Sequence, residues 1–295
     1  MRLRRSGQAL SLLVLASSCQ PEQKNETAKP FPLAVAFQPR GFSEIPRLQY
    51  PTQELVTEDL VLLRRSGFRS LVTYGAANVL GRVPQLARSA GFDGMIVMGI
   101  WDPFSEEERA NALNQVSFVD AYCIGNEGLG IRYRPGVLAP KMHDLRKLTR
   151  KPVTTSEPLS RYIEGPDHKW LTENSDWLFP IAHPYLAGHL DGPEAIQWVV
   201  TRHDYLRAAS GKTVILKEIG FPTHGAECCN EDTQLDFFRK LSATGIRFFF
   251  FEAFDQPHKR AIGRDPEPEH HWGLYKADGS PKKVVGWLPE LEVNQ

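Results

Sequence analysis

The sequence has no excess of charge of either sign, because 35 lysine and arginine residues balance 35 aspartate and glutamate residues. Proteins that bind nucleic acid usually carry a basic patch, so this balance argues against a polyanionic partner. We therefore expect a substrate that is neutral or weakly charged. The sequence also has no internal repeat and no domain-sized linker, and its 295 residues, 41% of them hydrophobic, suffice for one domain with a sizeable core.

Cysteine is scarce in this chain. Only four cysteines occur and only three follow Cys19, which is too few to indicate a disulfide framework. Cys123 falls in an apolar run and is expected in the core. Cys228 and Cys229 lie near His224, but adjacent thiols chelate a metal poorly and no second spaced pair exists. We expect no metal site, and we interpret these two cysteines as loop thiols or as a vicinal disulfide.

The first residues have the pattern of an export signal. Three arginines within residues 1–5 precede an apolar run over residues 9–16 that is too short to span a bilayer. The run leads into Cys19 and resembles a bacterial lipoprotein signal, in which cleavage before the cysteine leaves that residue to carry lipid. Ala16 stands where such signals prefer leucine, so ordinary secretion is the alternative.

Three regions follow from this pattern. Residues 1–18 are expected to be the signal peptide, residues 19–32 a polar, proline-containing flexible tether, and residues 33–295 the folded domain. The chain is then exported, either to a bacterial cell envelope where lipid on Cys19 anchors it or into the medium. We expect contact with a membrane only through that lipid, and we expect a monomer.

Short apolar runs alternate with segments of helical periodicity after the tether. Eight runs are predicted to be strands, at residues 33–37, 69–74, 93–101, 120–127, 151–157, 176–183, 213–218 and 246–255. Strands that alternate with helices form a parallel sheet, so eight such units predict an α/β fold, a single (β/α)8 TIM barrel. Ser105 is expected to cap a helix whose first turn contains three glutamates, and another helix is predicted over residues 140–150.

Glutamates stand at the ends of several predicted strands. Asn126 and Glu127 close the fourth strand, and Glu218 closes the seventh. A single strand-end glutamate is more often a capping or solvated residue, but catalytic groups of barrels gather at the carboxyl ends of strands, so we expect this pair to share one cleft. Paired carboxylates suit glycoside hydrolysis, in which one donates a proton to the leaving oxygen and the other attacks the sugar. Glu157 also ends a predicted strand, and a purely structural role for it is nearly as well supported as a role in binding substrate.

Eight short motifs fall in the order found in one enzyme family. They are TYG (73–75), GIW (99–101), GNE (125–127), PVTTSE (152–157), HPY (183–185), EIGFP (218–222), EAFDQPHK (252–259) and HWGLY (271–275). On these motifs the chain resembles glycoside hydrolase family 17, and its bacterial members more than the plant endoglucanases. Each motif is weak alone, whereas the eight together are specific.

The resemblance implies a barrel enzyme, over residues 33–295, that hydrolyses or transfers β-1,3-linked glucan with retention and without a metal or an organic cofactor. Carried over by position, Glu127 is the general acid/base and Glu218 is the nucleophile. The positions predicted to contact substrate are Tyr74, Asn126, Glu157, Tyr185, Phe221, Glu252 and Lys259. Lys217 lies on the opposite face of its strand by simple alternation, so we expect it to leave the pKa of Glu218 unchanged.

Several positions depart from the family pattern. Phe221, Leu186 and, relative to the bacterial members, His258 stand where tryptophan is usual, and Ile219 replaces a small hydroxyl residue beside the nucleophile. Aromatic faces give sugars a large apolar contact, so we expect the linkage and chain-length preference to be altered. Trp101 and Trp272 are kept, although either can serve barrel packing.

Other functions stay open at this point. A β-glucan transglycosylase would use the same carboxylates and pass the sugar to an acceptor hydroxyl. A non-catalytic glycan-binding lipoprotein would bind oligosaccharide without turnover, although the presence of both carboxylates and Asn126 weighs against it. A structural envelope protein would show neither binding nor turnover.

Overall fold

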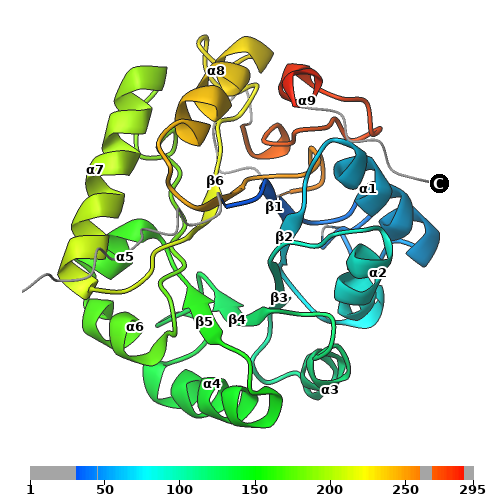
Figure 1. The fold of residues 1–295 in the computed structure, drawn as a ribbon, viewed down its shortest axis with the longest axis vertical. Helices are drawn as coiled ribbons and strands as arrows, with labels where there is room; N and C mark the ends of the chain where they lie inside the picture. Colours follow the sequence, from blue (N-terminus) through cyan, green and yellow to red (C-terminus); the bar gives the residue numbers. More distant parts are fainter. Residues whose placement is uncertain (1–30, 45, 260–267, 289–295) are drawn as a thin grey trace, which may run out of the picture. The chain divides into compact units, whose positions relative to one another are not determined.

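The structure, a computed structural model, describes residues 31–44, 46–259 and 268–288, and its strands form one curled parallel sheet ringed by helices (Figure 1). The sheet order is β5-β4-β3-β2-β1-β7-β6. The strands are β1 (Ala34–Phe37), β2 (Ser70–Thr73), β3 (Ile96–Ile100), β4 (Ala121–Asn126), β5 (Val153–Ser156), β6 (Leu216–Ile219) and β7 (Phe248–Phe250). The predicted signal peptide and Cys19 lie outside the described residues.

The strands are buried on both faces, because helices cover the outside of the sheet and side chains fill its interior. Every residue of β1, β2, β3 and β6 is buried. This explains why β1 and β3 are continuous apolar runs in the sequence instead of alternating patterns.

The sixth predicted strand, residues 176–183, closes the ring without forming a regular ladder. Its bridges are isolated: Leu178 pairs with Val214, and Ile181 pairs with both Pro158 and Glu218. Pro180 has no N–H to donate, although its carbonyl accepts from the Lys217 N–H at 2.8 Å. Seven regular strands and this bridged segment together confirm the predicted barrel class.

The described helices lie mostly between consecutive strands (Figure 1). They are α1 (Gln53–Arg65), α2 (Val83–Ser89), α3 (Glu106–Asn114), α4 (Pro135–Thr149), α5 (Leu159–Ile163), α6 (His168–Asn174), α7 (Gly192–Ser210), α8 (Glu231–Ser242) and α9 (Lys283–Trp287), with 3-10 turns η1 (Asn78–Arg82) and η2 (Pro268–His270). Ser105 accepts from the Glu108 N–H at 3.1 Å, which confirms the predicted cap of α3. Helix α4 begins five residues before the predicted start at Pro140, because Pro135 occupies its first turn, where proline is well tolerated.

Two strands contain an extra residue just before the carboxyl end. Cys123 of β4 pairs with Thr154 of β5, and Asn126 pairs with Ser156. Between these two pairs β4 therefore advances three residues while β5 advances two. Along β6 the pairing moves from Leu216 to Ile219, three steps, while β7 moves from Phe248 to Phe250, two steps. An extra residue of this kind is a β-bulge, which bends the strand and re-aims the side chains that follow.

Two further features concern the helices and the cysteines. None of the helices in the described ranges is both long and apolar enough to cross a membrane. The Sγ atoms of Cys228 and Cys229 lie 3.9 Å apart, so these residues are free loop thiols here and the vicinal disulfide is not formed. Cys123 is a buried core residue, as expected.

Candidate active site

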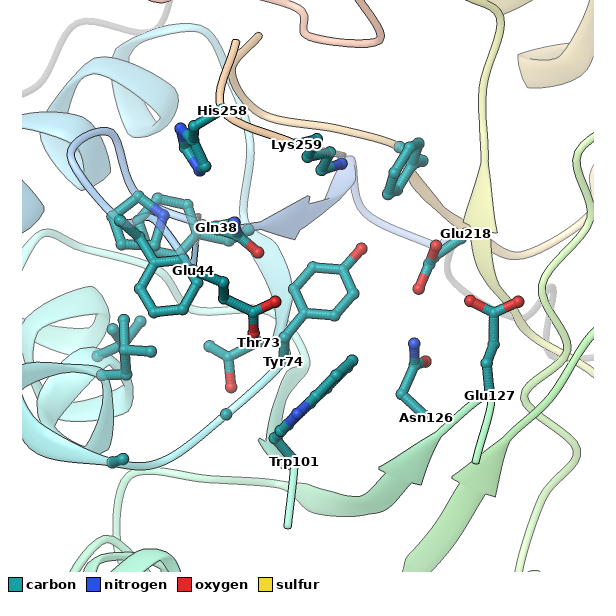
Figure 2. A pocket seen from close by; sticks show the side chains of 18 of the residues that line it. Gln38, Glu44, Thr73, Tyr74, Trp101, Asn126, Glu127, Glu218, His258 and Lys259 are labelled. Carbon is teal, nitrogen blue, oxygen red and sulfur yellow. The ribbon is translucent and has the colours of Figure 1, made fainter. Parts of the chain in front are cut away.

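A pocket of about 840 Å³ opens at the carboxyl ends of the strands. Figure 2 shows Asn126, Glu127 and Glu218 at one side of this pocket, with Gln38 and Glu44 at the other. The lining also includes Tyr74, Trp101, His183, Phe251, His258 and Lys259. The two predicted catalytic glutamates therefore lie on one cleft although they are far apart in the sequence.

Glu127 follows the last residue of β4 with a left-handed backbone (φ 46°). Its N–H donates to the Ser156 carbonyl at 2.9 Å, which fixes the end of the bulged strand. The residue is exposed to the cleft. Reduced hydration of the carboxyl group, and next the negative charge of Glu218, raise the pKa of Glu127.

Glu218 has the opposite environment. It is only 4% exposed, on β6. Burial alone would raise the pKa of this carboxyl, but the charge of Lys217 and the hydrogen bond and charge of His183 lower the pKa of Glu218 to about 2. Lys217 Nζ lies 3.0 Å from one carboxylate oxygen, and His183 Nε2 lies 3.5 Å from the other.

The prediction that Lys217 leaves Glu218 unaffected is wrong. The bulge in β6 breaks the alternation of faces, so the Lys217 side chain also enters the site. Its ammonium group donates to Asn126 Oδ1 and to Glu218 Oε1 and lies 4.3 Å from the ring centre of Tyr74. Lys217 is 1% exposed, which is rare for lysine unless its charge is paired.

Tyr74 and Asn126 line the same pocket as Glu218, as expected from the sequence. The Tyr74 hydroxyl is buried and, in Figure 2, points toward Glu218. Burial first, and then the charges of Glu218 and Glu252, raise the pKa of Tyr74 well above its usual value, so it is a neutral hydrogen-bond donor. Asn126 is buried and contributes its amide to the pocket wall.

Glu252 and Lys259 form an ion pair beside the pocket, with Lys259 Nζ donating to Glu252 Oε1 at 2.6 Å. Lys259 lines the pocket, whereas Glu252 lies behind it and is 1% exposed. Burial raises the pKa of Glu252 to about 7, because the charge of Lys259 offsets only part of the desolvation.

Besides Glu252, three other predicted contact residues do not line the pocket. Tyr185 and Phe221 are each 1% exposed and pack edge to face, with ring centres 5.7 Å apart, in an aromatic layer behind the wall. Glu157 accepts from the N–H groups of Gly128 at 3.0 Å and Leu129 at 2.8 Å, and from Arg161 at 3.1 Å. These bonds favour the structural role that the sequence left open for Glu157, since they hold the loop that follows Glu127.

The structure adds site residues to which the sequence gave no site role or left the role open. His183, from the HPY motif, contacts Glu218 directly. Trp101 forms one wall, and the Arg132 guanidinium lies 4.1 Å from its ring centre. Glu108 was interpreted as one acidic residue of a helix cap, yet its buried carboxylate accepts from three backbone N–H groups, those of Ala76, Trp101 and Asp102.

Residues 34–273 match the family model described as the BtgE/BtgC glycoside hydrolase domain. The chain belongs to this glycoside hydrolase family. A glucan 1,3-beta-glucosidase of Arthroderma benhamiae is 28% identical over 71% of this chain and 77% of its own length. A putative glucan endo-1,3-beta-glucosidase, btgC, of Aspergillus niger is 26% identical over 83% of this chain, which spans only 42% of that longer relative.

Solved structures agree with the family fold. The glycoside hydrolase family 17 β-1,3-glucanosyltransferase of Rhizomucor miehei superposes with a TM-score of 0.68 at 19% identity, covering 85% of this chain and 95% of the other. At this identity the likeness supports the barrel architecture alone. The expected resemblance to family 17 is confirmed by the match to the glycoside hydrolase family model and, for the fold, by this structure.

Proposed function

We propose that this glycoside hydrolase cleaves β-1,3-linked glucan with retention, through a covalent intermediate on Glu218. The observation that carries the proposal is that two glutamates on one cleft have pKa values shifted in opposite directions: the pKa of Glu127 is raised and the pKa of Glu218 is lowered to about 2. Pairs of carboxyl groups whose pKa values are driven apart take acid and nucleophile roles. The choice of β-1,3-glucan follows the names of the relatives.

In the first step, an ionised Glu218 oxygen attacks the anomeric carbon while the bond to the leaving oxygen breaks. Glu127 gives its proton to that oxygen, so the departing sugar leaves as an alcohol. Direct attack of this kind requires a carboxyl separation of about 5–5.5 Å, against about 6.5–9.5 Å for inversion.

In the second step, Glu127, now ionised, removes a proton from water or from an acceptor hydroxyl. The oxygen thus activated attacks the anomeric carbon, and the electron pair of the ester bond returns to Glu218. Water gives hydrolysis, and a second sugar gives transfer. Tyr74 and Asn126 are proposed to bind hydroxyl groups of the sugar at this centre, and Lys259 to bind the same sugar from the opposite wall. Glu252 is proposed to act through Lys259.

The test is mass spectrometry of the products formed by the purified protein from laminari-oligosaccharides. Shorter products establish hydrolysis, and longer ones establish transfer. Glu127→Gln should reduce the rate by about 10²–10⁴-fold, because general acid catalysis is lost. Glu218→Gln should abolish turnover, and Glu106→Gln, an exposed carboxylate on α3, is the matched control that should keep the wild-type rate.

Azide separates the two roles. In Glu127→Ala, azide attacks the glycosyl-enzyme made from an activated aryl β-glucoside and gives the β-azide. In Glu218→Ala, azide replaces the missing carboxylate and gives the α-azide. The reverse pattern of products would contradict the assigned roles. Unchanged oligosaccharides, with saturable binding, would favour the glycan-binding alternative.

We further propose export with lipid on Cys19, as the arginine-rich start and the apolar run at residues 9–16 indicate. Intact-mass measurement of the protein from membranes of a bacterial host should show a diacylglycerol adduct. Cys19→Ser should remove that adduct. Protein recovered only from the medium, without the adduct, would favour ordinary secretion.

A further inference from the structure

A fully buried cation occupies the centre of the site. Lys217 Nζ contacts Asn126 Oδ1 and Glu218 Oε1 and faces the Tyr74 ring, so its three neighbours are all residues of the proposed machinery. Burying an ammonium group is unfavourable unless charge and hydrogen bonds compensate it, and here one carboxylate supplies the compensating charge.

We propose that Lys217 is a positioning residue that keeps Glu218 ionised and fixes the orientation of the Asn126 amide. The ionisation of Glu218 and the orientation of Asn126 follow from the contacts alone. Their catalytic meaning rests on the function proposed above.

The charges that face Glu218 come from several elements. Lys217 on β6 and His183, after the bridged segment, lie against its two oxygens. Glu127 after β4 and Glu252 after β7 face Glu218 and add negative charge only when ionised, and neutral Tyr74 points toward it from the end of β2. Because burial disfavours ionisation of Glu218, the adjacent cation is needed to oppose it.

Lys217 also determines which end of the Asn126 amide faces the substrate. A lysine ammonium group has three donors and no acceptor, so the Asn126 atom that faces it must be the oxygen. The amide nitrogen is then the end that can donate to a sugar hydroxyl. A neutral side chain at position 217 would leave the Asn126 amide free to rotate, so that its oxygen and nitrogen could exchange places.

The same cation acts on the second step of the reaction. Formation of the ester removes the negative charge of Glu218 and leaves buried Lys217 without its compensating charge. Breaking the ester bond returns the electron pair to Glu218 and restores the ion pair. Lys217 should therefore favour breakdown of the glycosyl-enzyme, whether water or a sugar hydroxyl attacks it.

The first experiment needs no substrate. The side-chain carboxyl carbons of protein labelled with ¹³C-glutamate are followed by NMR from pH 2 to 8, with Glu218→Gln to assign the signal. In the wild type, the Glu218 signal should stay that of a carboxylate down to about pH 3, given a pKa of about 2. In Lys217→Met the midpoint of the Glu218 titration should rise by at least about one pH unit. Lys217→Arg should bring the midpoint most of the way back to its low wild-type value.

Lys282→Met is the control matched for burial, because Lys282 is 3% exposed and pairs with Asp255 at 2.7 Å instead of with Glu218. It should leave the Glu218 midpoint in place. An ordinary midpoint for Glu218 in the wild type would overturn the proposal even if no Lys217 variant folds. An equal midpoint in wild type and Lys217→Met would also overturn it.

The second experiment uses the reaction. In Lys217→Met the acid limb of the kcat/KM profile should move to higher pH, by the same amount as the NMR midpoint. Intact mass spectrometry should show glycosyl-enzyme accumulating on Glu218. Absence of activity toward β-1,3-glucan in the wild type would contradict the proposed function and leave the NMR result standing. A normal acid limb beside a shifted midpoint would refute the catalytic part of the inference.

Discussion

Replacing Gly125 by alanine should destabilise the protein and misplace its catalytic residues. Gly125 lies in the bulge of β4 with φ of 79°, a left-handed conformation, and a Cβ added there would lie 2.2 Å from the Tyr133 hydroxyl. The backbone conformation costs about 1–2 kcal/mol for a residue with a Cβ, and overpacking adds about 1–3 kcal/mol. The expected loss in the free energy of unfolding is therefore about 2–5 kcal/mol.

The assay is urea denaturation of the wild type, Gly125→Ala and a control. Gly136→Ala is that control, because Gly136 lies in α4 with no heavy atom within 4 Å of an added Cβ. It should be neutral or about 1 kcal/mol more stable, since alanine is the better helix former. Replacing Tyr133 by leucine in both backgrounds should recover part of the overpacking cost, which appears as coupling between the two sites.

The same substitution tests the link between strand geometry and chemistry. Gly125 immediately precedes Asn126 and Glu127, so movement of the chain there displaces both side chains. A misplacement of about 1 Å can cost about 10²-fold in rate. A Gly125→Ala variant that loses less than about 1 kcal/mol and keeps its rate would refute the reasoning.

Three further predictions concern buried carboxylates. Asp59→Asn, which breaks a buried ion pair (0% exposed, 2.5 Å to Arg40), should cost about 3–5 kcal/mol in urea denaturation, whereas Asp93→Asn, in a pair about half exposed, should cost less than about 1 kcal/mol. Glu157→Gln should cost about 1.5–3 kcal/mol and lower kcat, because hydrogen bonds to a charged group position the loop after Glu127, the proposed acid. The folded-state pKa of Glu252, about 7, exceeds its unfolded value of 4.5, so its contribution is complete below pH 4.5 and lost as the pH rises through 7. Wild-type stability should fall by up to about 3 kcal/mol over that window, and Glu252→Gln should flatten the profile measured by thermal unfolding at each pH.

The barrel, and the placement of Glu127 and Glu218 on one cleft, could be predicted because both depend on local signals. Apolar runs buried on both faces indicated the parallel strands, and carboxylates at the ends of such runs indicated the cleft. Glu127 and Glu218 meet in space because parallel strands present their carboxyl ends at the same rim, which no detail of loop geometry alters.

The errors came from geometry that the sequence does not display. A one-residue bulge reverses the face of every later side chain, so counting along β6 placed Lys217 on the wrong side. Tyr185 and Phe221 were assigned from motifs, and only the packed structure shows that they lie in a layer behind the pocket. Glu108 looked like a capping residue because its bonds to the amides of Ala76, 32 residues away, and of Trp101 depend on how the loops fold back onto α3.

The buried carboxylate of Glu108 gives the pocket a rigid side. It belongs to the first turn of α3, yet it holds the amides of Ala76, Trp101 and Asp102 at 2.8, 2.8 and 3.1 Å. The backbone of Trp101, whose side chain forms one wall of the pocket, is therefore fixed by hydrogen bonding to helix α3. A sugar too wide for this side would have to tilt α3 or break those bonds, so the wall selects ligands by fixed shape and cannot yield to them by loop movement alone.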